Sequence, residues 1–201
     1  GALQLVAGSG KGIIDHVTAQ DVVTFTGSAF TGQKLKAHPR LIEESVPFNL
    51  EADSLNAMVL GQQAAPGTVE FDIFIKEVTK EITVKAGQKC TAVRRIMVPE
   101  NYLEAAQQAI SSRLATTTIG DPSVEGVRMG ALATRLQVER VRQNVELLAQ
   151  SQQIVFGDLD NFDVVGADKN NGAFFSPILF LNDKPFENTA AHEIEAFGPV
   201  S

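Results

Sequence analysis

Cys90, the only cysteine of the sequence, is the side chain best suited to covalent chemistry. It lies in the run Gly87-Gln88-Lys89-Cys90-Thr91-Ala92, after an amphipathic stretch and before an apolar one. A thiol attacks only as its thiolate, which nearby positive charge or backbone N–H groups stabilise. Four cationic side chains are close in sequence: Lys85, Lys89, Arg94 and Arg95. Cys90 is therefore a candidate nucleophile, and the alternative is a small buried hydrophobic residue.

Two glycine-containing turns follow strand-like runs and could hold phosphate, because helix N-termini present free N–H groups and a positive dipole end. The first, Gly8-Ser9-Gly10-Lys11-Gly12, lacks the spacing of a Walker A loop and of the G-x-G-x-x-G fingerprint. In the second, the Ser28 hydroxyl could meet a phosphate, and Gly32 allows a helix to pack closely on its neighbour. Taken alone, each turn is more often structural than functional.

The composition is that of a soluble globular chain: 201 residues, 44% hydrophobic and 20% charged, enough for one large or two small domains. One cysteine permits no disulfide within the chain, and no signal peptide is recognisable, so a cytoplasmic location is expected. No apolar run reaches the ~20 residues of a membrane helix. The net charge of −7 disfavours nucleic acid. His16, His38 and His192 show no metal-ligand spacing with Cys90, so no metal is expected.

Strands, glycine turns and helices alternate along the sequence, which predicts an α/β fold. The expected strands are residues 2–7, 22–25, 44–50, 56–60, 94–98 and 173–181. The expected helices are residues 29–37, 69–86, 102–116 and 134–151. Residues 69–86 carry apolar side chains at three- and four-residue spacing. This helix ends shortly before Cys90.

Three motifs follow one another along the chain: Phe25-Thr26-Gly27-Ser28 with Gly32, then Gly87-Gln88-Lys89-Cys90, then Glu195-Ala196-Phe197-Gly198-Pro199-Val200. In this order they resemble the signature of the aldehyde dehydrogenase superfamily. The run Gly172-Ala173-Phe174-Phe175-Ser176-Pro177 also resembles a family segment. The runs 51–56 and 86–92 further resemble the phenylacetate-degradation branch, whose ring-opening and semialdehyde dehydrogenase enzymes act on CoA thioesters.

The resemblance implies an NAD(P)-dependent oxidation of an aldehyde. The Cys90 thiolate would add to the aldehyde carbon, hydride transfer would leave a thioester on sulfur, and water would release the acid. The branch resemblance makes Glu51 the general base for the hydrolysis. A gapless alignment on Ser54 and Asn56 instead places Asn49 where most relatives carry their glutamate. The alternative for Glu51 is a surface or helix-cap carboxylate.

The resemblance also implies a dinucleotide cofactor, NADP or NAD, with a slight preference for NADP. It assigns these residues to cofactor binding: Gly27 and Ser28 at the pyrophosphate, Gly32 in the same turn, Glu195 at the nicotinamide ribose, Phe197 beside the nicotinamide, and Gly8 and Gly10 near the adenosine half. The spacer between Gly10 and Phe25 is shorter than is usual in the family.

The fold implied is a three-layer α/β/α, aldehyde dehydrogenase-like catalytic domain with the end of a Rossmann-like dinucleotide-binding domain. Residues 1–53 would be the C-terminal part of the dinucleotide-binding domain. Residues 54–201 would be the thiol-bearing domain, truncated at its C-terminal end. An internal fragment of this kind is expected to bind cofactor weakly and to be inactive alone. The intact protein is expected to be a homo-oligomer acting on a small-molecule aldehyde, in this branch a CoA thioester.

Three other functions stay open from the residues alone. The thiol could serve a cofactor-free acyltransferase or hydrolase with a histidine base, although no histidine is suitably placed. The chain could instead be a non-catalytic assembly module with a buried Cys90. In a third case CoA, rather than water, would release the thioester.

Overall fold

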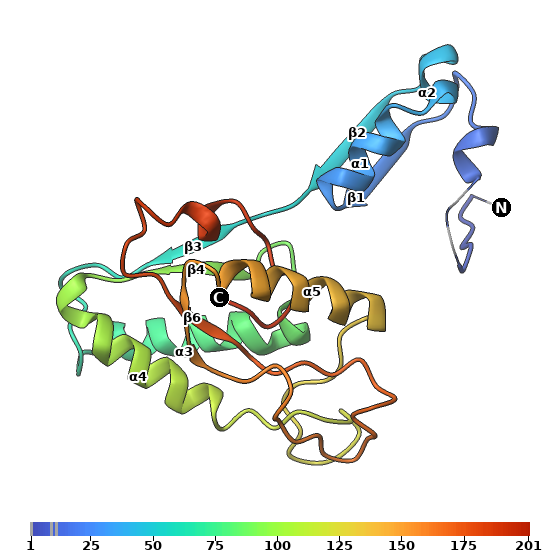
Figure 1. The fold of residues 1–201 in the computed structure, drawn as a ribbon. Helices are drawn as coiled ribbons and strands as arrows, with labels where there is room; N and C mark the ends of the chain where they lie inside the picture. The colour runs from blue at the N-terminus through green and yellow to red at the C-terminus, as the bar shows by residue number, and fades with distance from the viewer. Residues whose placement is uncertain (1, 9, 11) are drawn as a thin grey trace. The chain divides into compact units, whose positions relative to one another are not determined.

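The structure, a computed structural model, describes residues 2–8, 10 and 12–201 (Figure 1). The chain divides into two compact units, Gly1–Asp53 and Ser54–Ser201. The assignment of cofactor binding to the first unit and of thiol chemistry to the second stays a prediction.

The first unit is built on two parallel strands, β1 (Val23–Gly27) and β2 (Phe48–Ala52), in register from Val23 opposite Phe48 to Gly27 opposite Ala52. Its helices are η1 (Ile13–His16), α1 (Ala29–Lys36) and α2 (Pro39–Glu43). Gly32 is buried in α1, and a Cβ there would lie 2.3 Å from Leu50 Cδ1. Glycine therefore lets α1 pack directly on β2.

The strand expected over residues 2–7 is wrong, because these residues form neither helix nor strand. Leu3 and Leu5 are 92% and 93% exposed. An apolar run becomes a strand only where another strand satisfies its backbone groups, and β1 pairs with β2 instead. Ser9 and Lys11 of the first glycine turn lie outside the described residues.

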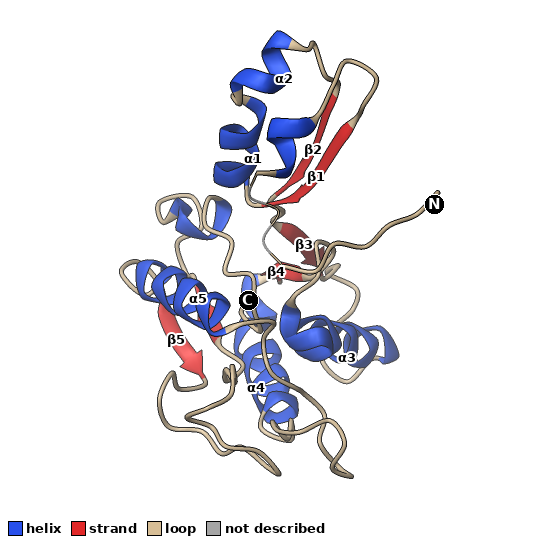
Figure 2. Ribbon diagram, turned by 90° about the vertical axis from the view of Figure 1, so that its right-hand side faces the viewer, coloured by secondary structure: helices blue, strands red, loops and turns tan. Residues whose placement is uncertain are grey.

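The second unit contains two further strand pairs (Figure 2). Strands β3 (Asn56–Val59) and β4 (Val93–Met97) are parallel, whereas β5 (Gln153–Phe156) and β6 (Leu179–Leu181) are antiparallel. Its α-helices are α3 (Val69–Thr83), α4 (Leu103–Leu114) and α5 (Arg135–Leu148). Short 3-10 helices complete it: η2 (Val84–Gly87), η3 (Glu100–Tyr102) and η4 (Thr189–His192).

Two hydrophobic clusters hold this unit together. In the first, the apolar face of α3 packs on α4, and Val78 and Ile82 of α3 are fully buried. The second gathers around α5, where Val141 and Val145 are fully buried. Ala86 of η2 belongs to the second cluster. The chain therefore passes from one core to the other immediately before Cys90.

Most expected helices and several expected strands are confirmed, and the chain has the mixed α/β fold that the sequence predicts. The three-layer arrangement stays a prediction. Several boundaries differ, among them the start of β2, which is at Phe48 rather than at residue 44. Two of the differences have a clear physical reason. The helix from Val69 ends at Thr83, because the backbone takes positive φ at Lys85, Ala86 and Gly87. The strand over 173–181 shrinks to Leu179–Leu181, since Pro177 has no N–H for a ladder.

Candidate active site

The segment of Cys90 is shaped by three successive residues in the left-handed region. Lys85, Ala86 and Gly87 have φ of 54°, 50° and 68°. A Cβ on Gly87 would lie 2.1 Å from the carbonyl oxygen of Gly198, so the two backbones touch here. Cys90 follows this turn and is exposed rather than buried.

The carbonyl group of Cys90 accepts hydrogen bonds from two side chains at the start of β3, those of Ser54, just before the strand, and Asn56, its first residue. Ser54 Oγ donates a hydrogen bond to it at 2.5 Å, and Asn56 Nδ2 donates another at 2.7 Å. Asn56 Nδ2 also donates to the carbonyl of Ala92 at 3.0 Å. Because β3 and β4 are parallel neighbours, the residues before β3 and those before β4 meet at one edge. The backbone that follows the Cys90 side chain is therefore fixed.

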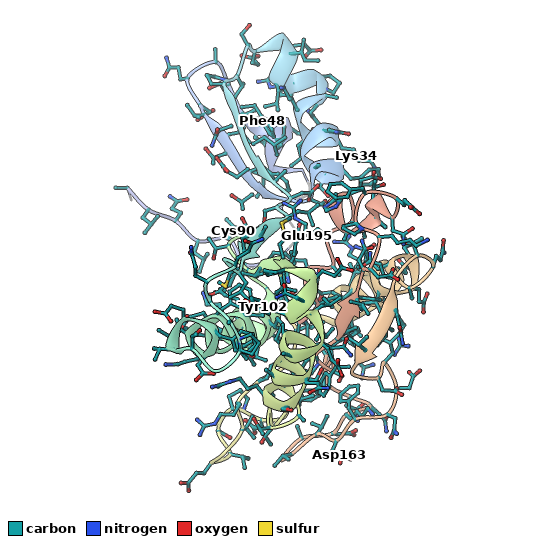
Figure 3. The ribbon with its side chains drawn as sticks, turned by 90° about the vertical axis from the view of Figure 1, so that its left-hand side faces the viewer. Lys34, Phe48, Cys90, Tyr102, Asp163 and Glu195 are labelled. Atoms are coloured by element: carbon teal, nitrogen blue, oxygen red, sulfur yellow. The ribbon has the colours of Figure 1, made fainter. Side chains whose placement is uncertain are left out.

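Glu195 is held next to the same Ser54. The backbone N–H of Ser54 donates to Glu195 Oε2 at 3.2 Å. From α5, Asn144 donates to the carbonyl of Glu195 at 2.8 Å, and Gln137 donates to the carbonyl of Phe197 at 2.9 Å. Figure 3 shows Cys90 and Glu195 in the same region of the unit. Ser54 thus contacts both the thiol-bearing segment and the segment of Glu195.

Arg94 lies beneath this arrangement, with only 7% of its surface exposed. Its Nη2 donates to the carbonyl of Gly87 and its Nη1 to that of Gly198, each at 2.6 Å. Its Nε lies 3.8 Å from Glu195 Oε1, and its guanidinium lies 5.6 Å from the ring centre of Phe197. Burial lowers the pKa of Arg94, while the negative charge of Glu195 opposes that shift.

Three of the four cations expected near the thiol, Lys89, Arg94 and Arg95, are bonded to other groups. Arg94 donates to the carbonyls of Gly87 and Gly198, and Lys89 Nζ pairs with Glu81 Oε1 at 2.7 Å. Arg95 donates to the carbonyl of Leu55. The two arginines therefore support the backbone around Cys90, whereas Lys89 is paired with a carboxylate.

In the first unit, the carboxyl ends of β1 and β2 bring several predicted residues to one edge. Gly27 ends β1, and Ser28 caps α1 by accepting a hydrogen bond from Thr31 N at 3.3 Å. Glu51 lies opposite Thr26 on β2, with an exposed side chain. Gly8 and Gly10 face open space, because a Cβ at either position would have no heavy atom within 4 Å.

Asp53, which the sequence reading missed, belongs to the same edge. Both of its carboxylate oxygens lie 3.2 Å from Ala29 N, the first residue of α1, and its φ is 46°. The signal that could have revealed it is a carboxylate directly after a strand that runs parallel to β1. Negative charge is favourable at the N-terminus of a helix.

Two further features of the described residues bear on function. Among them, no three His, Cys, Asp or Glu side chains gather as a metal site. No helix in the described part of the chain is long and apolar enough to cross a membrane.

Comparison with known proteins identifies the family. Residues 1–201 match the model of the aldehyde dehydrogenase family. The chain belongs to this family. This aldehyde dehydrogenase chain is 43% identical, over 201 residues, to 3,4-dehydroadipyl-CoA semialdehyde dehydrogenase from Aromatoleum evansii, covering 100% of this chain and 39% of that protein. It is 28% identical over 180 residues to hydroxyisobutyraldehyde dehydrogenase from Mycolicibacterium austroafricanum, covering 89% of this chain and 33% of that protein.

A solved structure of the same fold is betaine aldehyde dehydrogenase from Staphylococcus aureus in complex with NAD+. The TM-score is 0.76 at 22% identity, over 90% of this chain and 34% of that one. The family model over residues 1–201 confirms the superfamily predicted from the three motifs. The Aromatoleum relative is named for a CoA-linked semialdehyde, which is the substrate class of the branch that the motifs resemble. The aldehyde dehydrogenase chain spans about two fifths of that relative's length.

Proposed function

We propose that this chain carries the nucleophile of an aldehyde dehydrogenase that oxidises a CoA-linked semialdehyde of aromatic degradation, such as that of phenylacetate, to the acid. The observation that carries the proposal is the exposed Cys90, whose carbonyl is fixed by Ser54 and Asn56 while Ser54 also holds Glu195. The name of the 43% identical Aromatoleum relative supports the choice of substrate class.

The chemistry begins at the sulfur of Cys90. The thiolate forms a bond to the aldehyde carbon, and the carbonyl electron pair moves to oxygen. A bound nicotinamide would accept hydride from that carbon, so that a thioester remains on Sγ. Glu51 takes a proton from water, the hydroxide adds to the thioester carbon, and the carbon–sulfur bond breaks. The products are the acid and the regenerated thiolate.

The residues proposed to hold the dinucleotide have suitable chemistry. The carboxylate of Glu195 can accept hydrogen bonds from ribose hydroxyl groups, and the half-buried ring of Phe197 suits a flat nicotinamide. Gly27 and Ser28 are exposed at the N-terminus of α1. We assign them to the pyrophosphate, Gly32 to the close packing of that helix, and the exposed Gly8 and Gly10 to the adenosine side. The cofactor proposed is NADP or NAD.

The test uses the full-length protein with the CoA-linked semialdehyde for which the Aromatoleum relative is named, and follows the absorbance of the reduced cofactor. Cys90→Ala is expected to abolish both the burst and steady turnover, a loss of about 10⁴-fold or more. Glu51→Gln should retain one burst per site and lose about 10²- to 10⁴-fold of steady turnover, because only the hydrolysis needs the base. Glu125→Gln, an exposed carboxylate, is the matched control.

Two outcomes would reject these roles. Normal turnover by Cys90→Ala would show that the thiol is not the nucleophile. Absence of the burst in Glu51→Gln would show that Glu51 acts before hydrolysis. In water labelled with heavy oxygen, label in the product acid is expected, and its absence would favour release of the thioester by CoA.

A further inference from the structure

Arg94 is the buried charge that the proposed chemistry does not use. Its guanidinium donates to the carbonyls of Gly87 and Gly198 at 2.6 Å each. Gly87 comes just before Cys90 in sequence, and Gly198 just after Glu195. We propose that Arg94 is a positioning residue that locks the thiol-bearing segment and the segment of Glu195 and Phe197 into one fixed spacing. The inference rests on the proposed function, which assigns the nucleophile to the first segment and contacts to the nicotinamide to the second.

The chemistry of the side chain explains why arginine is needed here. A guanidinium is planar and presents several N–H donors in a rigid fork, whereas lysine offers one compact ammonium group. The two carbonyls belong to backbones that already touch, since a Cβ on Gly87 would lie 2.1 Å from Gly198 O. One fork that bonds both carbonyls removes the freedom of either segment to slide past the other.

The remaining contacts of Arg94 all go to the second segment. Its Nε faces Glu195 Oε1 at 3.8 Å, and the Phe197 ring lies 5.6 Å from the guanidinium carbon. A third carbonyl, that of Val200, lies 3.5 Å from Nη1. The same cation therefore neutralises the carboxylate and orients the ring proposed for the nicotinamide side. Loss of the fork would disturb both groups together with the carbonyl of Gly87.

The test compares Arg94→Lys and Arg94→Gln with the matched control Arg142→Lys in the full-length protein. Arg142 also donates to a backbone carbonyl, that of Leu159, but on the surface beside Asp160. The first measurement is hydrogen exchange of the cofactor-free protein. We expect exchange to rise about 10-fold, in both Arg94 variants, in the peptides that span residues 87–92 and 195–200. The peptides of α3 and α4 should be unchanged.

The second measurement is the rate of the hydride-transfer burst at saturating cofactor. A misplacement of about 1 Å can cost about 100-fold in rate, so we expect Arg94→Lys to slow the burst about 10- to 100-fold. Its thermal midpoint should stay close to that of the wild type. Arg142→Lys should alter neither measurement.

Several results would overturn the inference. Exchange that rises equally in α3 and α4, or a failure of both Arg94 variants to fold, would assign Arg94 to global stability. A burst of normal rate in Arg94→Lys would remove it from positioning. Exchange that rises in only one of the two segments would show that they are not coupled. The exchange measurement needs neither substrate nor cofactor, so a failure of the proposed function, seen as normal turnover by Cys90→Ala, is distinguishable from a failure of this inference.

Discussion

Gly87 satisfies two demands that no other residue type can meet together. Its φ is 68°, in the region that favours glycine, and its α-carbon faces the backbone of Gly198 and Pro199. The two preceding residues, Lys85 and Ala86, take positive φ as well, although they carry side chains. The turn before Cys90 is therefore a strained segment that its surroundings keep in place.

Gly87→Ala is expected to destabilise the protein by about 2–4 kcal/mol, because a Cβ would overlap the Gly198 carbonyl as well as strain the backbone. Gly67→Ala is the control, since Gly67 also has positive φ, 91°, but faces open space. The control should cost only about 1 kcal/mol. Thermal unfolding of the full-length variants measures both. Equal shifts in the two variants would show that the close approach is unimportant.

The sequence could identify Cys90, Glu195 and Phe197 as candidates, because their motifs are local. It could not identify what holds them. Ser54 and Asn56 reach Cys90 across more than thirty positions of sequence, and Arg94 reaches Gly198 across more than a hundred. Such pairs arise from strand order and loop packing, which no local pattern encodes. For the same reason the sequence shows Arg94 and Lys89 only as charges near the thiol, whereas in the structure Arg94 donates to backbone carbonyls and Lys89 pairs with Glu81.

Among the helices, α5 bonds directly to the segment of Glu195 and Phe197. Its first turn carries Gln137, which donates to the carbonyl of Phe197. Thr134 is the N-cap that precedes the helix, and its hydroxyl accepts a hydrogen bond from Gln137 N at 3.1 Å. The cap and the contact to the site therefore belong to one turn of helix.

Thr134→Ala should destabilise the second unit by about 1 kcal/mol, because the N–H of Gln137 loses the hydroxyl oxygen of Thr134 and keeps only the carbonyl of residue 134 as acceptor. Thr134→Ser keeps the hydroxyl and should cost only a few tenths of that. Urea-induced loss of helical circular dichroism in the full-length protein compares the two. A serine variant as unstable as the alanine variant would show that the methyl group, rather than the cap, is responsible.

Helices were more predictable than strands for a physical reason. The three- and four-residue spacing in α3 reflects a buried face, so its existence follows from sequence, whereas its end at Thr83 depends on the left-handed turn. A strand depends on its partner. The apolar run 2–7 has none in the structure and forms no strand, and β5 was missed although β6 pairs with it.

Over the whole molecule, aspartates in both units stabilise loops by accepting hydrogen bonds from backbone N–H groups. In four aspartates such a hydrogen bond is the largest cause of a lowered pKa. The acceptor and the N–H donor are Asp21 and Thr18, Asp121 and Ser123, Asp158 and Asp160, and Asp168 and Asn170. A lowered pKa in the folded state means that the folded protein binds fewer protons than the unfolded one. Their contribution is complete above the ordinary pKa of aspartate, about 4, and is lost as the pH falls through the folded-state value.

Acidification below about pH 4 should therefore loosen the loop of residues 158–161 before the α3–α4 core. Hydrogen exchange of Asp160 and Asn161, whose N–H groups donate to Asp158 Oδ1 at 2.8 Å, reports the change. Asp158→Asn should remove most of the pH dependence, because the amide does not titrate. Unchanged pH dependence in that variant would assign the effect to other carboxylates.

The two hydrogen bonds to the carbonyl of Cys90 have a consequence for how this residue can respond to covalent modification. Because Ser54 and Asn56 both donate to that oxygen, the peptide plane after the cysteine cannot turn without breaking them. Any group attached to sulfur must then be accommodated by rotation about the Cα–Cβ and Cβ–Sγ bonds alone. An acyl group or an alkylating inhibitor on sulfur could therefore occupy only the positions that these two rotations reach. Ligands would be selected by how well their shape fits the fixed atoms around those positions, because the main chain does not move.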